Sequence, residues 1–159
     1  MLRKSLSVLL PMVAVVALQA VDAAPASAVT YGCSGSPVGS WPVTMKNAAG
    51  GTYYRSDIKL YYNADTGWKC AVLVKRPGLP RYGERTPMSI YMENARMSRG
   101  NVRNNQDNDA GRFKYYAGPV KVYGRHLCVT IVAAHGDHTG TRYDEGPYGT
   151  RQLGSIACD

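Results

Sequence analysis

Two stretches of the chain share one alternation of apolar and polar positions: Ile58 to Lys75 and Val120 to Val132. In each, an apolar-Lys-apolar-Tyr run precedes a polar turn, and a cysteine then opens four β-prone residues. A period of two is typical of a strand with one buried face. Both stretches therefore predict a β-hairpin, with Cys70 and Cys128 in matching positions.

The remaining apolar positions predict further short strands. We expect them over Trp41–Lys46, Met88–Met97, Phe113–Tyr116 and Val120–Tyr123. Pro42 indicates an edge for the first of these, because proline cannot donate to a neighbouring strand. Cys70 to Val74 is apolar on both faces, which is typical of a central strand covered on both sides. A helix over Met92–Met97 is the alternative for the second strand, although no cap residue supports it.

Polar segments separate these strands. Arg76–Pro87 holds three prolines and two glycines and predicts a loop. Ser98–Arg112 is the most polar stretch and predicts a mobile loop, and residues 117–119 predict a bend or bulge. The tail from His135 to Asp159 has room for two short strands. The pattern as a whole predicts an all-β fold, a small antiparallel β-sandwich or barrel.

The start of the chain reads as a secretory signal peptide. Arg3 and Lys4 precede an apolar run from Leu6 to Val21, and Ala26-Ser27-Ala28 has the small residues that signal peptidase requires. We expect a cleaved helix over residues 1–28 and one exported β-domain over residues 29–159. Cleavage after Ala23 is an alternative, and a retained membrane anchor is another.

Charge and aromatic content suggest what the exported domain could contact. The chain has 19 basic and 11 acidic residues, and removing the signal peptide leaves 17 against 10, or about +7. Excess positive charge favours salt-sensitive attraction to anionic polymers such as cell-wall phosphates, acidic glycans or nucleic acid, although solubility alone also explains it. Twelve tyrosines against two tryptophans and one phenylalanine suit strands with a half-wet face.

All four cysteines lie in the exported part, which predicts two disulfides. Because Cys70 and Cys128 each open the second strand of a hairpin, neighbouring strands would pair them with each other. Cys33 and Cys158 would then tie the two ends together. A zinc site is not indicated, since the chain has no CxxC spacing.

Four segments of the exported part carry a family resemblance. They are YGCSGS, LYYNADTGWKCAVLV, DAGRFKYYAGPVKV and Leu127-Cys128-Val129. These segments resemble small secreted proteins of spore-forming filamentous bacteria, including the spore-associated protein A group. The resemblance implies an exported, disulfide-linked β-domain associated with spores or the cell surface. It implies no activity and no role for any single residue.

Few residues suggest catalysis or metal binding. The cluster His135-Gly136-Asp137-His138 could hold a metal, but residues three apart face opposite sides of a strand, so a solvated loop is our expectation. Asp144 and Glu145 are expected on a turn, because Gly and Pro follow them. No GxSxG elbow and no cofactor motif occurs. We therefore expect a non-catalytic protein without a cofactor.

Binding has more support than catalysis. Lysines alternate with tyrosines along the expected strands, and such a face can cradle a polyanion. The candidate surface residues are Lys59, Tyr61, Lys114, Lys121 and Tyr123. The alternative is that half of these rings face the core and the lysines keep a sheet edge soluble.

We expect the partner to be an anionic polymer of the cell wall or spore surface, and neither nucleic acid nor a membrane. An extracellular protease inhibitor that presents Arg76–Arg85 is one alternative, and a small secreted hydrolase is another. The sequence leaves the ligand and the oligomeric state open.

Overall fold

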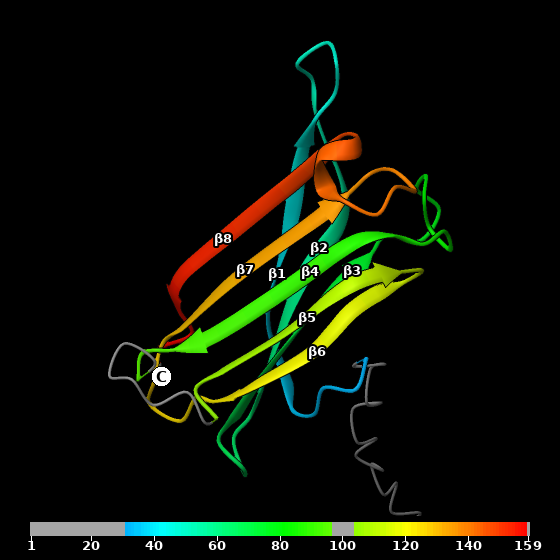
Figure 1. The fold of residues 1–159 in the computed structure, drawn as a ribbon. Coiled ribbons are helices and arrows are strands. Elements are labelled where there is room, and N and C mark those ends of the chain that lie inside the picture. The colour runs from blue at the N-terminus through cyan, green and yellow to red at the C-terminus, as the bar shows by residue number, and fades with distance from the viewer. Residues whose placement is uncertain (1–30, 97–103, 159) are drawn as a thin grey trace, which may run out of the picture.

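The computed structural model describes residues 31–96 and 104–158, which form eight strands and one 3-10 turn (Figure 1). The expected signal peptide and residues 98–103 of the expected polar loop lie outside the described residues. The strands are β1 (Ser36–Lys46), β2 (Thr52–Asn63), β3 (Trp68–Lys75), β4 (Thr86–Asn94), β5 (Gln106–Phe113), β6 (Tyr116–Tyr123), β7 (Val129–Gly136) and β8 (Tyr148–Ile156), and the 3-10 turn is η2 (Tyr143–Glu145).

The strands form two four-stranded antiparallel sheets that pack face to face (Figure 1). One sheet has the order β1-β2-β3-β6 and the other β5-β4-β7-β8. This arrangement confirms the expected all-β antiparallel sandwich with two disulfides. Pro42 lies in the edge strand β1, and β3 is an inner strand that is buried on both faces, as the sequence predicts.

The core lies between the sheets and follows from the alternation of side chains along each strand. On β4, Met88, Ile90 and Met92 all point inward, so the strand and not the helix is the correct interpretation of this segment. Ile58 and Leu60 of β2 meet them from the other sheet. Each buried side chain of this size stabilises the fold by roughly 1.5–3 kcal/mol, which makes this layer the main source of stability.

Side chains join the sheet edges where the two sheets approach each other. Asp109 Oδ2 accepts a hydrogen bond from Gly118 N at 2.7 Å, and Asp107 Oδ2 accepts one from Lys121 N at 2.8 Å. Two carboxylates of β5 therefore satisfy main-chain donors of β6 in the other sheet. At the opposite side β8 lies close to β1, where a side chain at Gly149 would collide with the carbonyl oxygen of Thr44.

The expected second hairpin is wrong. β6 pairs with β3, whereas β7 pairs with β4 and β8, so the turn at residues 124–126 crosses from one sheet to the other. The expected bulge at residues 117–119 is confirmed by a register shift between β3 and β6. Among the described residues the tail beyond residue 136 forms one strand, β8, where two short strands had room.

The expected polar loop is also wrong over Gln106–Arg112, which belongs to strand β5. Phe113 ends that strand, and residues 114–115 form the turn into β6, so no strand runs from Phe113 to Tyr116. The segment is polar because β5 is an edge strand that is mostly exposed, and because two of its aspartates bind main-chain groups.

The four cysteines form two disulfides, but the expected pairing is wrong. Cys33 is bonded to Cys70 with a Cα separation of 5.6 Å, and Cys128 to Cys158 with a Cα separation of 4.1 Å. Cys70 points away from the core to the outer face of the β1-β2-β3-β6 sheet, where the lead-in with Cys33 covers it. Cys128 comes just before β7 in the other sheet, so Cys70 and Cys128 do not lie on neighbouring strands.

Candidate functional site

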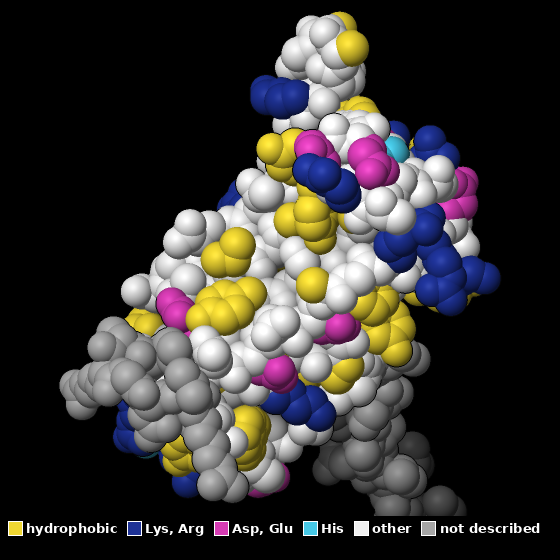
Figure 2. All heavy atoms as spheres, viewed as in Figure 1, with side chains coloured by type: hydrophobic (Ala, Val, Ile, Leu, Met, Phe, Trp, Pro, Cys, Tyr) yellow, Lys and Arg dark blue, Asp and Glu magenta, His cyan; other side chains and the backbone are white. Residues whose placement is uncertain are grey.

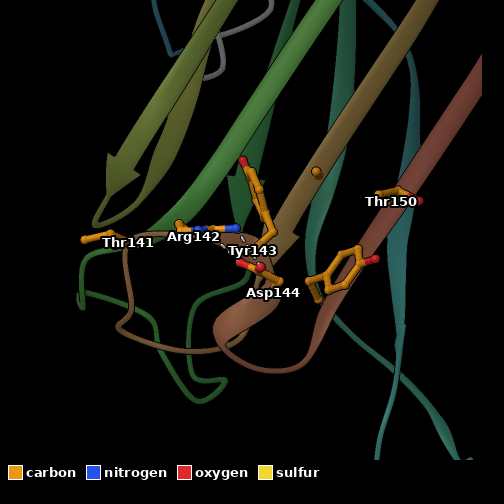
Figure 3. Close-up of a pocket in the computed structure, with 7 residues that line it drawn as sticks. Thr141, Arg142, Tyr143, Asp144 and Thr150 are labelled. Carbon is orange, nitrogen blue, oxygen red and sulfur yellow. Dashed lines mark hydrogen bonds and ion pairs between the residues drawn. The ribbon is translucent and has the colours of Figure 1, made fainter.

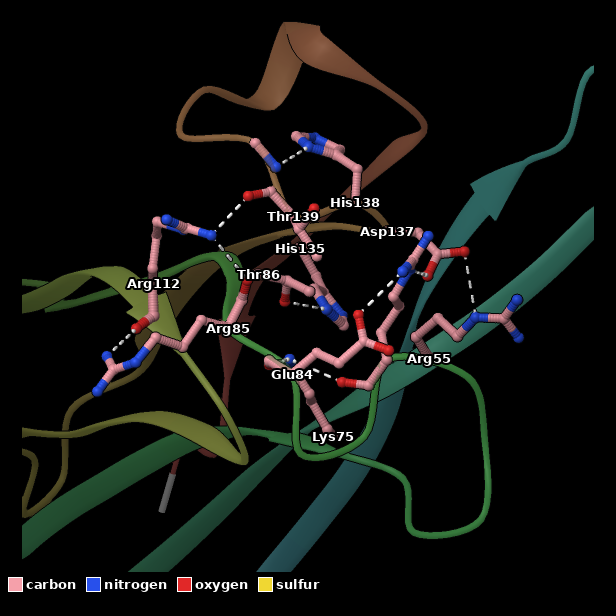
Figure 4. A network of polar contacts seen from close by, with 12 residues as sticks. Arg55, Lys75, Glu84, Arg85, Thr86, Arg112, His135, Asp137, His138 and Thr139 are labelled. Carbon is pink, nitrogen blue, oxygen red and sulfur yellow. Dashed lines mark hydrogen bonds and ion pairs between the residues drawn. The ribbon is translucent and has the colours of Figure 1, made fainter.

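A polar cluster closes one end of the core (Figure 4). His135 of β7 bonds through Nδ1 to Ser56 Oγ of β2 at 3.0 Å, and through Nε2 to Thr86 Oγ1 of β4 at 3.0 Å. All three side chains are fully buried. Burial first, and then the positive charges of Lys75 and Arg55, lower the pKa of His135 from 6.5 to about 3. The imidazole is therefore neutral at physiological pH.

The contact between His135 and Ser56 resembles a base beside a hydroxyl nucleophile. Such a pair acts on a substrate only when the reacting oxygen can reach it. Here Ser56, His135 and Thr86 have no exposed surface, so the contact is part of the core.

Lys75 lies beside this cluster with 1% of its surface exposed. Its Nζ donates to three main-chain carbonyls: Arg81 O at 3.1 Å, Glu84 O at 2.7 Å and Phe113 O at 3.0 Å. Burial lowers the pKa of Lys75 from 10.5 to about 8, although the nearby carboxylate of Glu84 opposes this shift. One ammonium group thus fixes the loop of residues 76–85 against the end of β5.

Asp137 and His138 follow His135 in the chain and make contacts outside the cluster. Asp137 Oδ2 accepts a hydrogen bond from Arg55 Nε at 3.2 Å, within an ion pair. His138, 9% exposed, accepts from Gly140 N through Nδ1 at 3.1 Å. The expected solvated loop is therefore wrong at both histidines. Within residues 31–96 and 104–158 no three His, Cys, Asp or Glu side chains converge as metal ligands.

A second buried lysine closes the other end of the core. Lys69 Nζ donates to Leu127 O at 2.8 Å and to Ala157 O, next to the Cys128–Cys158 disulfide. The burial of these two lysines was not predicted from the sequence. One signal in the sequence was available: along β3 both lysines lie at alternate positions with Ala71 and Leu73, so they share the inward face of the strand.

The candidate binding residues do not form one surface. Lys59, Tyr61 and Lys121 lie on the outer face of the β1-β2-β3-β6 sheet, but Tyr61 is 6% exposed and packs with the Cys33–Cys70 disulfide. Lys59 Nζ lies 5.4 Å from the ring centroid of Tyr31. Tyr123, at the end of β6, packs edge-on against the ring of Trp68. Lys114 lies apart from these residues, in the turn between β5 and β6.

Lys114 instead joins a basic and aromatic surface that we call the basic tip. The basic tip consists of Arg85, Arg112, Lys114, Tyr82 and Tyr115, all exposed. Figure 2 shows the concentration of basic side chains at this end of the molecule, where the loop before β4 meets the β5–β6 turn. Gly83 N donates to Lys114 O at 3.1 Å and ties the two segments together.

The arginines of the basic tip are held beside each other. Arg85 Nη1 donates to Arg112 O at 3.2 Å, and Arg112 Nη2 donates to Arg85 O at 3.3 Å (Figure 4). The rings of Tyr82 and Tyr115 lie 5.2 Å apart. In the described part of the chain no carboxylate forms an ion pair with Arg85, Arg112 or Lys114. In residues 31–96 and 104–158 the three side chains are therefore exposed cations without an ion pair.

A groove of about 520 Å³ opens on the outer side of the other sheet, near η2 (Figure 3). We call it the tyrosine groove. It is lined by Ala134, Thr141, Arg142, Tyr143, Asp144, Tyr148 and Thr150. Asp144 and Glu145 lie in the 3-10 turn η2, which confirms the expected turn. Glu145 accepts hydrogen bonds from Thr141 N and Oγ1, and the bond from Thr141 N lowers the pKa of Glu145.

Comparison with known proteins returns no match: no family model, no curated protein and no solved structure is significantly similar to this chain. In residues 31–96 and 104–158, no helix is long and apolar enough to cross a membrane.

Proposed function

We propose that this chain is an exported, non-catalytic protein that binds an anionic polymer of the cell or spore surface through the basic tip. The observation that carries this proposal is a group of three cations beside two exposed tyrosine rings; among the described residues, no carboxylate forms an ion pair with these cations. Two disulfides in a small β-domain suit an oxidising environment outside the cell.

The basic tip supports this function better than the sheet face does. On the sheet face, Lys59 lies over an aromatic ring, and Arg76 is held at 2.5 Å by the carboxylate of Asp57. A guanidinium that is already ion-paired attracts a polyanion more weakly. At the basic tip, main-chain carbonyls orient the guanidinium groups but do not neutralise them, so their attraction for an anion remains.

The experiment measures retention of the oxidised protein on immobilised polyphosphate, isolated cell walls and spores across a salt series. We expect retention at low salt that disappears at high salt, because exposed charges are screened. The variant Arg85→Gln/Lys114→Gln should elute at lower salt than the wild type. The matched control Lys59→Gln/Lys121→Gln removes the same charge from the sheet face and should elute close to the wild type.

Two outcomes would contradict the proposal. Equal elution of both double variants would show that net charge alone drives retention. The absence of retention on all three materials would exclude an anionic surface partner.

A protease inhibitor is the second candidate, because Lys75 braces the loop that carries Tyr82. Its Nζ binds Arg81 O and Glu84 O on either side of the exposed ring, which would keep such a loop in a fixed shape for a protease cleft. Titration of the protein against trypsin-like and chymotrypsin-like extracellular proteases tests this candidate, and inhibition lost in Tyr82→Ala but kept in Tyr54→Ala would favour it.

A further inference from the structure

We propose that the tyrosine groove binds an uncharged oligosaccharide. This inference does not depend on the basic tip, because it rests on a different sheet and on different side chains. Four features support it: two tyrosine rings, a surface ion pair, hydroxyl groups at both ends and a rigid loop that holds them.

The two tyrosines provide an aromatic surface for the apolar face of a sugar ring. The ring centroids of Tyr143 and Tyr148 lie 6.4 Å apart, with an angle of 57° between their planes. Tyr148 is 52% exposed, the highest value among the exposed large hydrophobic side chains of the described residues. Tyr143 is half-buried against Ser89, and burial raises the pKa of its hydroxyl, so this phenol keeps its proton and can donate a hydrogen bond at neutral pH.

The ion pair beside these rings suits hydroxyl groups. Arg142 donates to Asp144 through Nε at 3.1 Å and through Nη2 at 2.9 Å, so the contact is bidentate. Both side chains are more than half exposed, and an ion pair in such a position contributes little to stability. The pair retains free donors and acceptors, and sugar hydroxyls use both.

The charge of the groove distinguishes the ligand class. Its lining holds one guanidinium and one carboxylate, which neutralise each other, and otherwise only hydroxyl and apolar side chains. A polyanion would meet Asp144, and an apolar partner would leave the Arg142–Asp144 pair desolvated. Thr141 and Thr150 lie at opposite ends of the labelled residues in Figure 3 and place hydroxyl groups along the groove. A neutral molecule rich in hydroxyl groups fits this lining.

The loop that builds the groove is fixed before any ligand arrives. His138 is buried and bonds to Gly140 N and Tyr143 O, while Glu145 holds Thr141. A side chain at Gly140 would collide with the Glu145 carboxylate, and one at Gly146 would lie 2.9 Å from the His138 ring. Rigid loops lose less entropy on binding, which favours the weak contacts that sugars make.

The experiment follows backbone NMR shifts during titration with chitotetraose and, separately, cellotetraose at constant salt. We expect saturable shifts at Tyr143, Tyr148 and Thr150 with at least one of the two, and little change when salt is raised. Tyr148→Ala should weaken binding by roughly tenfold or more, as loss of a central aromatic contact does. Tyr148→Phe keeps the ring and should retain most of the affinity.

Tyr115→Ala is the matched control, because it removes a ring of similar exposure, 47% against 52%, from the basic tip. It should bind the sugar as the wild type does, and Tyr148→Ala should still be retained on polyphosphate if the basic tip functions as proposed. Absence of saturable shifts with both sugars at millimolar concentration would overturn the inference. Shifts at the groove that depend on protein concentration without sugar would also overturn it, since the occupant would then be a second copy of the chain.

Discussion

Acid should destabilise this domain through His135. In the folded state Ser56 and Thr86 occupy both ring nitrogens, burial excludes water, and the pKa of His135 falls from 6.5 to about 3. The unfolded chain takes up a proton on this ring below about pH 6.5, whereas the folded chain does not until about pH 3. The stability that the neutral ring provides is therefore complete above pH 6.5 and is lost as pH falls towards 3.

The size of this loss of stability follows from the difference between the pKa of His135 in the folded and in the unfolded chain. Between the two pKa values the free energy of unfolding should fall by about 1.4 kcal/mol for each pH unit. From about pH 7 to about pH 4.5 the loss from His135 alone is about 2.5 kcal/mol. That is a large fraction of the stability of a small domain, which is typically about 5–15 kcal/mol.

Urea unfolding of the oxidised protein, followed by tryptophan fluorescence at several pH values, measures this loss. The variant His135→Gln cannot titrate, so the difference between wild type and variant removes the contribution of the carboxylates, which both proteins share. Val132→Ala, at an exposed position of the same strand, changes no titrating group; it is the control and should keep the pH dependence of the wild type. Parallel curves for wild type and His135→Gln would refute the reasoning, as would an NMR titration of the His135 ring near pH 6.

Three further predictions concern stability. Lys75→Met leaves three main-chain carbonyls without their donor and should cost roughly 3 kcal/mol in urea unfolding at neutral pH. Because the folded pKa of Lys75 is about 8 and the unfolded value 10.5, the stability of the wild type relative to this variant should rise by about 1.5 kcal/mol from about pH 8 to about pH 9.5. Cys128→Ser/Cys158→Ser opens a loop with a sequence separation of 30 and should cost about 4 kcal/mol. Mass spectrometry of unreduced peptides should then find only Cys33–Cys70 in that variant, and a Cys70–Cys128 peptide in the wild type would contradict the structure. Gly149→Ala pushes a methyl group into a main-chain oxygen of β1 and should lower stability by roughly 1–3 kcal/mol, whereas Gly154→Ala meets open space and should not collide with any neighbour.

The sequence predicted those strands in which one face is apolar. β2, β3 and β4 each place regular apolar positions in the core, and local alternation is sufficient to find them. Strand β5 was not predicted, because its side chains are mostly exposed and polar and because its pairing depends on β4 beside it. An exposed edge strand of this kind shows no alternation of apolar and polar residues, so its composition is that of a loop.

The choice of sheet could not be predicted from local pattern. The segment Val120–Val132 has the same order of residue types as β2 and β3, yet its two strands enter different sheets. A turn of three residues permits either a hairpin or a crossing between layers, and contacts with distant strands decide between them. The predicted disulfide pairing failed for the same reason, since it assumed that Cys70 and Cys128 lie in neighbouring strands.

The candidate site was predicted in part. Lys114 was expected on a binding surface, but Arg85, Arg112 and Tyr82 come from other parts of the chain and meet it only in three dimensions. The tyrosine groove was not predicted, because Tyr143 and Tyr148 lie in a tail with little periodicity. The glycines on either side of His138 were its only signal, and they indicated a loop without showing which side chains that loop presents.

The central strand β3 connects these surfaces to the core. Its inward face begins and ends with a lysine, and each ammonium group binds a carbonyl that is distant in sequence: Lys69 binds those of Leu127 and Ala157, and Lys75 binds that of Phe113. Lys75 holds the loop that carries Tyr82 and Arg85, and it also holds the carbonyl of Phe113, directly before Lys114. A lysine in the core costs desolvation energy that an apolar residue would not, so packing alone does not explain its place. Its three carbonyl contacts supply the missing reason, because one buried charge sets the positions of both segments that form the basic tip. A substitution at Lys75 should therefore weaken polymer binding although it changes no exposed side chain.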